Sequence, residues 1–259
     1  MAPPSTPSRD DPSSLVHLPH APLPAYYRSG DAGAREAFLR ATFDDTAVDY
    51  NRLEKILGLG TGSWYRRQAL QRAGLAKGMQ VVDVGMGTGL VSREILNITG
   101  EPDRLIGVDP SPGMMKEAQF DTPVECRIGR AEAIPVPDAS ADFVVMGYAL
   151  RHIADFAAAA AEFRRVLKPG GRLLILEITR AESRWGNALL KAYMRGAVPL
   201  MARLVSKAEA TPMLWRYYWD TIEACVPPAE VVHTLAAHGL LDVERHVELG
   251  IFSEYRARG

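Results

Sequence analysis

Short apolar runs alternate with amphipathic stretches along residues 78–180, and this alternation is the clearest pattern in the sequence. Continuous, β-branched apolar runs are typical of strands buried on both faces of a parallel sheet. Between them, apolar residues at three- and four-residue spacing are typical of helices. We therefore predict strands at 80–84, 104–108, 124–128, 142–146 and 172–178, and helices at 90–98, 112–119 and 155–167. Strands that alternate with helices indicate an α/β fold with a doubly wound, mostly parallel sheet and helices on both faces.

The segments that flank this alternation are mainly helical. Helical spacing runs from residue 32 to 75, with a glycine-rich interruption near residue 60, and returns at 183–207, 213–224 and 228–238. The last two apolar runs, at 241–248 and 251–257, are joined so closely that they must pair antiparallel. With this hairpin the predicted sheet has seven strands.

These elements predict a single domain over residues 26–259. Its parts are N-terminal helices (26–77), a core (78–180), an inserted helical lid (181–225), and a terminal helix with the hairpin (226–259). Proline, serine and aspartate dominate much of residues 1–25, so we expect a flexible lead-in there. Its lack of a continuous apolar run argues against a signal peptide.

Composition and charge narrow the class of protein. With 47% hydrophobic and 24% charged residues, the chain is neither a disordered protein nor a coiled-coil rod. A formal net charge of −1 gives no global field that would attract nucleic acid. Cys126 and Cys225 lack the spacing of a disulfide framework or a zinc site, so we expect no metal and interpret both as core residues in a reducing cytoplasm. No apolar run reaches the length of about 18 residues that a membrane-spanning helix needs.

A glycine-rich loop follows the first predicted strand. Gly85, Gly87 and Gly89 form a GxGxG pattern between that strand and a helix, where ligands of open α/β sheets bind. Glycines at such a place let a ligand approach the backbone closely. Leu90 stands where the GxGxxG dinucleotide motif needs its third glycine, and no Walker lysine follows. A tight strand-to-helix turn without a ligand is the structural alternative.

Asp109 adds a second constraint at the end of the second predicted strand. A carboxylate at this place can accept both hydroxyls of a ribose. The alternative role is a helix N-cap, but Ser111 can cap the following helix instead. The residues by themselves therefore predict a ribose-containing cofactor.

The motifs together resemble class I S-adenosylmethionine-dependent methyltransferases. The resemblance rests on Val81–Gly89, Gly107–Asp109, Arg130–Pro135 and Leu167–Gly171, and covers roughly residues 78–178. It implies a Rossmann-like fold and S-adenosylmethionine as cofactor. It assigns the cofactor site to residues of the glycine loop and the following strand ends: Asp83, Gly85, Gly87, Thr88, Gly89, Asp109, Pro110, Arg130, Ala131, Glu132 and Gly147.

A narrower resemblance, to the UbiE-like family, covers more of the chain. It rests on Phe43-Asp44, Ala47–Asn51, Gly60, Tyr65–Arg67, Ala131–Asp138 and Ala149–His152. The family C-methylates the ring of ubiquinone and menaquinone precursors. Asn51 stands where the family usually has aspartate, and His152 where it usually has asparagine.

Carbon methylation of a phenolic ring needs a base for the ring hydroxyl and a cation near the resulting oxyanion. His152 lies just after the fourth predicted strand, and the unperturbed pKa of the histidine side chain suits the base. Arg151 stays protonated and suits the oxyanion, and the family's N-terminal motif adds Tyr50 as a third candidate. The structural alternatives are a salt bridge for Arg151, a helix-entry residue for His152 and a packing wedge for Tyr50.

Two apolar segments leave alternatives open. Trp185–Leu204 fits a lid over a greasy substrate that also contacts a membrane surface, or a helix packed on the sheet or in a homodimer. Met213–Trp219 either walls an aromatic pocket or is core.

The sequence therefore favours C-methylation of a phenolic or quinone-type small molecule. The alternatives are O- or N-methylation of a specialised metabolite, or a binding protein without turnover; nucleic-acid methylation is disfavoured because no NPPY-type motif follows the fourth strand.

Overall fold

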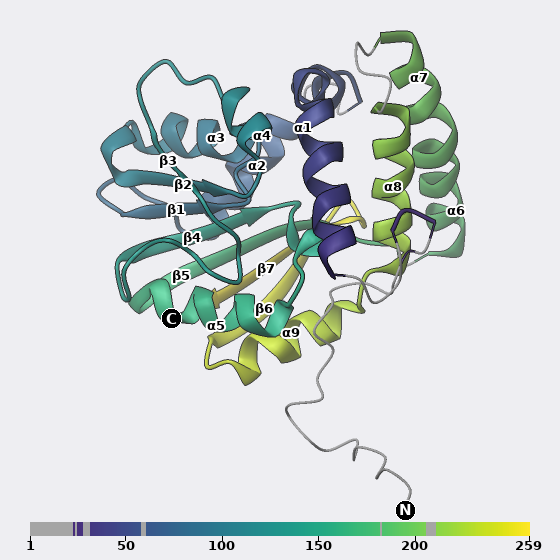
Figure 1. Cartoon of the computed structure of the whole chain (residues 1–259). Helices are drawn as coiled ribbons and strands as arrows, with labels where there is room; N and C mark the ends of the chain where they lie inside the picture. Colours follow the sequence, from purple (N-terminus) through teal and green to yellow (C-terminus); the bar gives the residue numbers. More distant parts are fainter. Residues whose placement is uncertain (1–22, 24, 28–31, 58–60, 182, 206–210) are drawn as a thin grey trace, which may run out of the picture.

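A seven-stranded sheet in the order β3-β2-β1-β4-β5-β7-β6 organises the molecule (Figure 1). The computed structural model describes residues 23, 25–27, 32–57, 61–181, 183–205 and 211–259, so the predicted flexible lead-in lies almost entirely outside the described residues. The strands are β1 (Val81–Val84), β2 (Leu105–Asp109), β3 (Glu125–Ile128), β4 (Ala141–Gly147), β5 (Leu167–Ile178), β6 (Leu241–Glu248) and β7 (Phe252–Arg258).

The strand directions confirm the predicted fold. β1 pairs in parallel with both β2 and β4, and β3 and β5 extend the parallel part on either side. β7 runs antiparallel to β5 and to β6, as the short joint between the last two apolar runs requires. β5 begins five residues before its predicted start at 172. Leu167 already pairs with Ala141, and Gly170 and Gly171 exchange backbone hydrogen bonds with Gly259, so the residues between the predicted helix (155–167) and the predicted strand (172–178) belong to the sheet.

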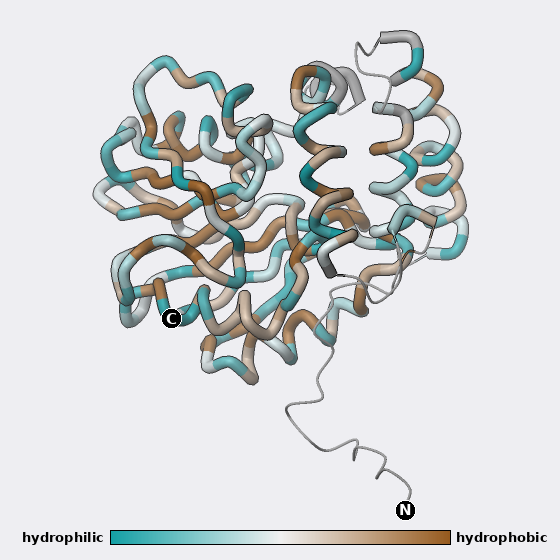
Figure 2. The backbone as a smooth tube through the Cα atoms, in the orientation of Figure 1, coloured by the Kyte–Doolittle hydropathy of each residue, from teal (hydrophilic) through white to brown (hydrophobic). Residues whose placement is uncertain are grey.

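Helices cover both faces of the sheet. α2 (Thr61–Arg72) and α3 (Leu90–Thr99) pack on one face, and α5 (Phe156–Val166) and α9 (Pro228–Ala237) on the other. Successive residues of β4 point to opposite faces: Phe143 and Val145 contact the first pair of helices, and Val144 and Met146 the second. Both sets are fully buried, which explains why the strand is a continuous apolar run, visible as brown tube in Figure 2.

A separate helical layer stands beside the sheet. It consists of α1 (Ala32–Leu57), α6 (Arg184–Ala192), a π-helical turn (Tyr193–Ala197), α7 (Val198–Val205) and α8 (Thr211–Ala224) (Figure 1). Its core is largely aromatic, with Tyr217, Tyr218 and Trp219 of α8 buried against Phe38 and Phe43 of α1. The short helix α4 (Pro112–Lys116) follows β2 and ends three residues before its predicted end at 119.

The prediction for the cysteines is partly wrong. Cys126 is exposed because β3 is an edge strand with little packed over it, and Cys225 is half-buried; both are free thiols. Among the described residues, none of the helices combines the length and the hydropathy that a bilayer crossing requires.

Candidate active site

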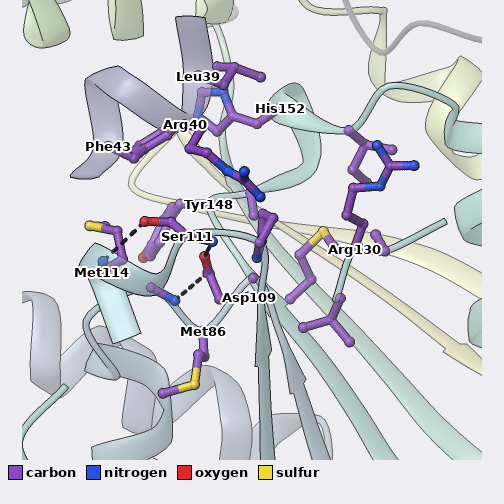
Figure 3. A pocket seen from close by; sticks show the side chains of 18 of the residues that line it. Leu39, Arg40, Phe43, Met86, Asp109, Ser111, Met114, Arg130, Tyr148 and His152 are labelled. Atoms are coloured by element: carbon purple, nitrogen blue, oxygen red, sulfur yellow. Dashed lines mark hydrogen bonds between the residues drawn. The ribbon is translucent and has the colours of Figure 1, made fainter. Parts of the chain in front are cut away.

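A cavity of about 600 Å³ lies beyond the carboxyl ends of β1, β2 and β4, between the sheet and α1 (Figure 3). Its position matches the rule that ligands of open α/β sheets bind at these strand ends. Most of the residues predicted to hold the cofactor line it: Gly85, Gly87, Thr88, Asp109, Pro110, Arg130, Ala131, Glu132 and Gly147. Asp83 and Gly89 do not.

Asp109 holds the glycine loop in place from the end of β2. Its carboxylate accepts hydrogen bonds from the backbone N–H groups of Gly87, at 2.7 Å, and Ser111, at 2.8 Å (Figure 3). Ser111 takes the capping role, because its hydroxyl accepts from the N–H of Met114 at the start of α4. Each carboxylate oxygen of Asp109 retains acceptor capacity for a ligand hydroxyl. Burial raises the pKa of Asp109 to about 6.

The glycine loop uses conformations that other residues rarely adopt. Gly85 and Gly87 have φ of +71° and +54°, and a Cβ on Gly85 would lie 2.7 Å from the Cβ of Ala149. Gly89 also has a positive φ, but a Cβ added there would meet the ring of Phe120, and Gly89 does not line the cavity. At Gly85 and Gly87 the loop therefore presents backbone, with no side chain, to one side of the cavity.

Asp83 lies behind the loop, where it is fully buried. The hydroxyl of Ser92 donates to one carboxylate oxygen at 2.6 Å, and burial raises the pKa of this carboxyl to about 7. Since Asp83 does not reach the cavity, the structure places it as a support for the loop rather than as a direct contact of a cofactor.

Helix α1 forms the opposite wall of the cavity, and Tyr50 is the one residue of this wall that was predicted as a candidate site residue. Arg35, Leu39 and Phe43 share one helical face with Tyr50, and all four line the cavity. Their four-residue spacing is the signal that could have found them. Two polar residues tie this helix to the core: Asp44 accepts from the N–H of Gly113, at 2.9 Å, and from the Ser111 hydroxyl, and Asn51 accepts from the Thr88 hydroxyl.

His152 reaches the cavity from a 3₁₀ turn after β4. Its ring meets Phe43 edge to face, with centroids 5.1 Å apart, and lies nearly parallel to the ring of Tyr217 at 5.7 Å. Two backbone carbonyls of this turn, of His152 and Ile153, accept hydrogen bonds from Arg35 of α1. Helix α1 therefore holds His152 in two ways: Phe43 contacts its ring, and Arg35 binds the backbone carbonyls of its turn.

Arg151, predicted as the cation near the substrate oxyanion, does not line the cavity. It is 3% exposed and forms an ion pair with Glu177, which is itself fully buried at the end of β5. A buried carboxylate requires such a counter-charge, so the salt-bridge alternative describes its position. The guanidinium carbon also lies 4.7 Å from the centroid of the Tyr218 ring. Glu177 was not among the predicted site residues; the signal that could have found it is a lone acid at the end of an otherwise apolar strand.

The aromatic segment of α8 has both predicted roles. Trp215, Tyr217 and Trp219 are buried without reaching the cavity, whereas Tyr218 lines it and donates a hydrogen bond to the hydroxyl of Tyr50 at 3.2 Å. Of the side chains that the structure describes between Trp185 and Leu204, none lines the cavity. The predicted lid segment packs on α8 instead, through Met194 and Val198, and α1 is the helix that covers the cavity.

Comparisons with known proteins found relatives in sequence. The sequence model of the ubiE/COQ5 methyltransferase family matches residues 32–252. A ubiquinone/menaquinone biosynthesis C-methyltransferase of Geobacter sulfurreducens is 31% identical over 88% of this chain and 90% of its own. A demethylmenaquinone methyltransferase of Lactiplantibacillus plantarum is 34% identical over 64% of this chain and 73% of its own.

Solved structures share the fold at lower identity. A methyltransferase of Thermotoga maritima, described as a possible histamine N-methyltransferase, superposes with a TM-score of 0.60 at 21% identity, covering 85% of this chain and 99% of that one. Phosphoethanolamine N-methyltransferase 2 of Haemonchus contortus, solved with S-adenosylmethionine, gives a TM-score of 0.57 at 21% identity over 84% of this chain and 46% of that one.

Proposed function

Because this chain belongs to the ubiE/COQ5 methyltransferase family, we propose that it methylates a ring carbon of a phenolic or quinone-type aromatic substrate. It is an S-adenosylmethionine-dependent methyltransferase. The observation that supports the substrate class is the division of the cavity. Its loop side is polar backbone around Asp109, and its α1 side is a group of rings from Phe43, Tyr50, His152 and Tyr218.

The residues on the loop side fit the cofactor. Asp109 has acceptor capacity for ribose hydroxyls, and the positive-φ glycines leave room beside the backbone that a Cβ would fill. Arg130 and Glu132, after β3, lie on the same cavity. S-adenosylmethionine bound there supplies an electrophilic methyl group on a sulfonium.

The chain's own residues have three tasks in this reaction. The aromatic side of the cavity orients a flat ring and excludes water, which aligns the ring carbon with the methyl donor. His152 takes the proton of the ring hydroxyl, so that the adjacent carbon becomes electron-rich. Tyr50 lies on the same wall and is placed to hold the ring oxygen. Arg151 contributes its positive charge from behind this wall.

A product analysis tests the proposed function. The protein is incubated with reduced naphthoquinone and S-adenosylmethionine carrying an isotopically labelled methyl group, and the product is examined by NMR. We expect an aromatic C-methyl signal. A methoxy or N-methyl signal would instead support the alternative of O- or N-methylation. Binding of both ligands without any product would support the non-catalytic alternative.

The outer face of α6 and α7 supports a contact with an anionic membrane surface. Trp185, Leu189 and Leu200 are 85%, 71% and 61% exposed, respectively. Between residues 183 and 205 the chain contains four cations and no acidic residue, although two of the cations pair with acids of α8. Apolar side chains beside cations are typical of helices that lie on anionic lipid. A cytoplasmic location, with both cysteines as free thiols, belongs to the same proposal.

Vesicle sedimentation tests this contact. We expect the protein to bind phosphatidylglycerol vesicles more strongly than phosphatidylcholine vesicles, and the double substitution Trp185→Ser, Leu189→Ser to abolish binding. Trp64→Ser on α2, where Trp64 is 58% exposed, is the matched control and should bind normally. If the double substitution converts a dimer to a monomer and vesicle binding is absent throughout, the face is a homodimer interface.

A further inference from the structure

A pair of tyrosine hydroxyls lies in the aromatic wall of the cavity. Tyr218 of α8 donates to the hydroxyl of Tyr50 of α1, with the two oxygens 3.2 Å apart. Both residues line the cavity, and Tyr218 is only 4% exposed. The donated hydrogen bond connects two helices that are far apart in sequence, and it lies where the ring of a substrate would be held.

The direction of this hydrogen bond determines what Tyr50 can do. A hydroxyl has one proton and two acceptor lone pairs, and Tyr218 occupies one of the lone pairs of Tyr50. The proton of Tyr50 is then available for a third group. Burial raises the pKa of both tyrosines above the ordinary value, so both hydroxyls keep their protons and act as donors.

Arg151 strengthens Tyr218 as a donor. Its guanidinium lies over the face of the Tyr218 ring, with the guanidinium carbon 4.7 Å from the ring centroid. A cation on the ring face draws electron density from the ring and makes its hydroxyl more acidic. Glu177 holds Arg151 at this position through the buried ion pair. Arg151 therefore polarises the hydroxyl of Tyr218, which in turn polarises the hydroxyl of Tyr50 at the cavity.

We propose that Tyr218 is a positioning residue that aims the O–H of Tyr50 into the cavity, where Tyr50 holds the oxygen of the ring to be methylated. This inference rests on the proposed function, because it names the group that recognises the phenolic oxygen. It also gives Arg151 a role that does not need contact with the substrate. The relay runs from Arg151 to Tyr218, from Tyr218 to Tyr50, and from Tyr50 to the substrate.

The neighbouring residue offers a matched control. Tyr217 is as buried as Tyr218, but it does not line the cavity, and among the described residues its hydroxyl has no hydrogen-bond partner. Replacing either tyrosine by phenylalanine removes one buried hydroxyl from α8 and keeps the ring. Only the Tyr218 substitution removes the relay.

The experiment compares Tyr218→Phe, Tyr217→Phe, Tyr50→Phe and the double substitution of Tyr50 and Tyr218, with reduced naphthoquinone as substrate. We expect Tyr218→Phe to lower kcat/KM about tenfold and Tyr217→Phe to leave it unchanged, with S-adenosylmethionine affinity equal in all variants. The double substitution should be no worse than Tyr50→Phe alone, because the relay acts through Tyr50. Equal kcat/KM in Tyr218→Phe and Tyr217→Phe, or multiplicative losses in the double variant, would overturn the proposal.

A second measurement separates this inference from the proposed function. If the wild-type protein does not methylate reduced naphthoquinone, the substrate class is wrong, and the variants are then compared by binding of para-nitrophenol, whose colour reports its ionisation. We expect the wild type and Tyr217→Phe to bind the dye about equally and Tyr218→Phe to bind it about tenfold more weakly. Equal binding by all three overturns the relay.

Discussion

The side chain of Asn51 on α1 accepts a hydrogen bond from the hydroxyl of Thr88 in the glycine loop. This contact ties the covering helix to the loop on the cofactor side of the cavity. Aspartate, the residue usual in the family at this position, could accept the same bond. We therefore expect Asn51→Asp to keep S-adenosylmethionine affinity within about twofold, and Asn51→Leu to weaken it by about two- to tenfold. Calorimetric titration measures both, with Asn97→Leu, at an exposed position of α3, as control.

The affinity for S-adenosylmethionine should depend on pH through Asp109. Burial raises the pKa of its carboxyl from 3.8 to about 6. The ionised form is the better acceptor for ribose hydroxyls, so affinity should fall as the pH is lowered through about 6. Titrations between pH 5 and 8 measure the dependence. Asp109→Asn should remove the fall in affinity near pH 6, whereas Asp83→Asn should retain it. An unchanged pH profile in Asp109→Asn would contradict the role of Asp109 as the acceptor for the ribose hydroxyls.

The same shift has the opposite sign for stability. Between pH 3.8 and about 6 the folded protein holds a proton on Asp109 that the unfolded chain has released. This contribution to the free energy of unfolding is fully present at low pH and is lost as the pH rises through about 6. Asp109→Asn should remove that slope, as measured by urea unfolding of the ligand-free protein at several pH values.

Two glycines with the same backbone conformation should respond differently to alanine. Gly85 and Gly170 have φ of +71° and +77°, but a Cβ meets another atom within 4 Å only at Gly85. Gly170→Ala should cost the conformational penalty alone, about 1–2 kcal/mol, and leave cofactor binding intact. Gly85→Ala should cost more and abolish cofactor binding, because the loop must shift away from Ala149. Thermal unfolding and calorimetric titration of both variants provide the measurement.

Breaking the ion pair of Arg151 and Glu177 should lower the free energy of unfolding more than replacing both residues by apolar ones. Glu177→Gln leaves the buried guanidinium without its counter-charge, and we expect a loss of about 3–5 kcal/mol in the free energy of unfolding. Replacing both residues by methionine should cost less than this single substitution. The double variant should still lose turnover, because no charge then lies over Tyr218. Denaturant unfolding and steady-state kinetics separate the two effects.

His152 should behave as a base. His152→Ala should reduce turnover by about 10²–10⁴-fold with little change in S-adenosylmethionine affinity, and the pH–rate profile should lose its rising limb where histidine titrates. His152→Asn introduces the residue usual in the family. If asparagine restores most of the rate, His152 positions the substrate by hydrogen bonding and the proton leaves by another route.

The sheet could be predicted from the sequence because most of its strands can be recognised from their own residues. Short runs such as Val81–Val84 and Ala141–Gly147 carry apolar residues on both faces, which a strand between two helical layers requires. Strand ends were less predictable. β5 starts at Leu167 because Leu167 pairs with Ala141 and because Gly170 and Gly171 bond to Gly259, and both partners are far away in the sequence.

The site was predictable where a motif marks the backbone and unpredictable where packing decides. The glycine loop and Asp109 are recognisable from spacing, and the structure places them on the cavity. The position of Arg151 depends on Glu177, which lies 26 residues away, and no local pattern pairs the two. The role of α1 depends on how the helical layer docks against the sheet, which the spacing of Arg35, Leu39 and Phe43 does not specify.

Helix α1 contacts both ends of the cavity: Asp44 and Asn51 bind the loops around the cofactor side, while Phe43 and Tyr50 belong to the aromatic side. If the helix moves as a unit, one displacement uncovers both sides together. The spent cofactor and the methylated product would then be released during the same opening, and neither would need a separate exit. Turnover would be timed by this one helix, so the rate of its undocking would set an upper limit on kcat however fast the methyl group is transferred.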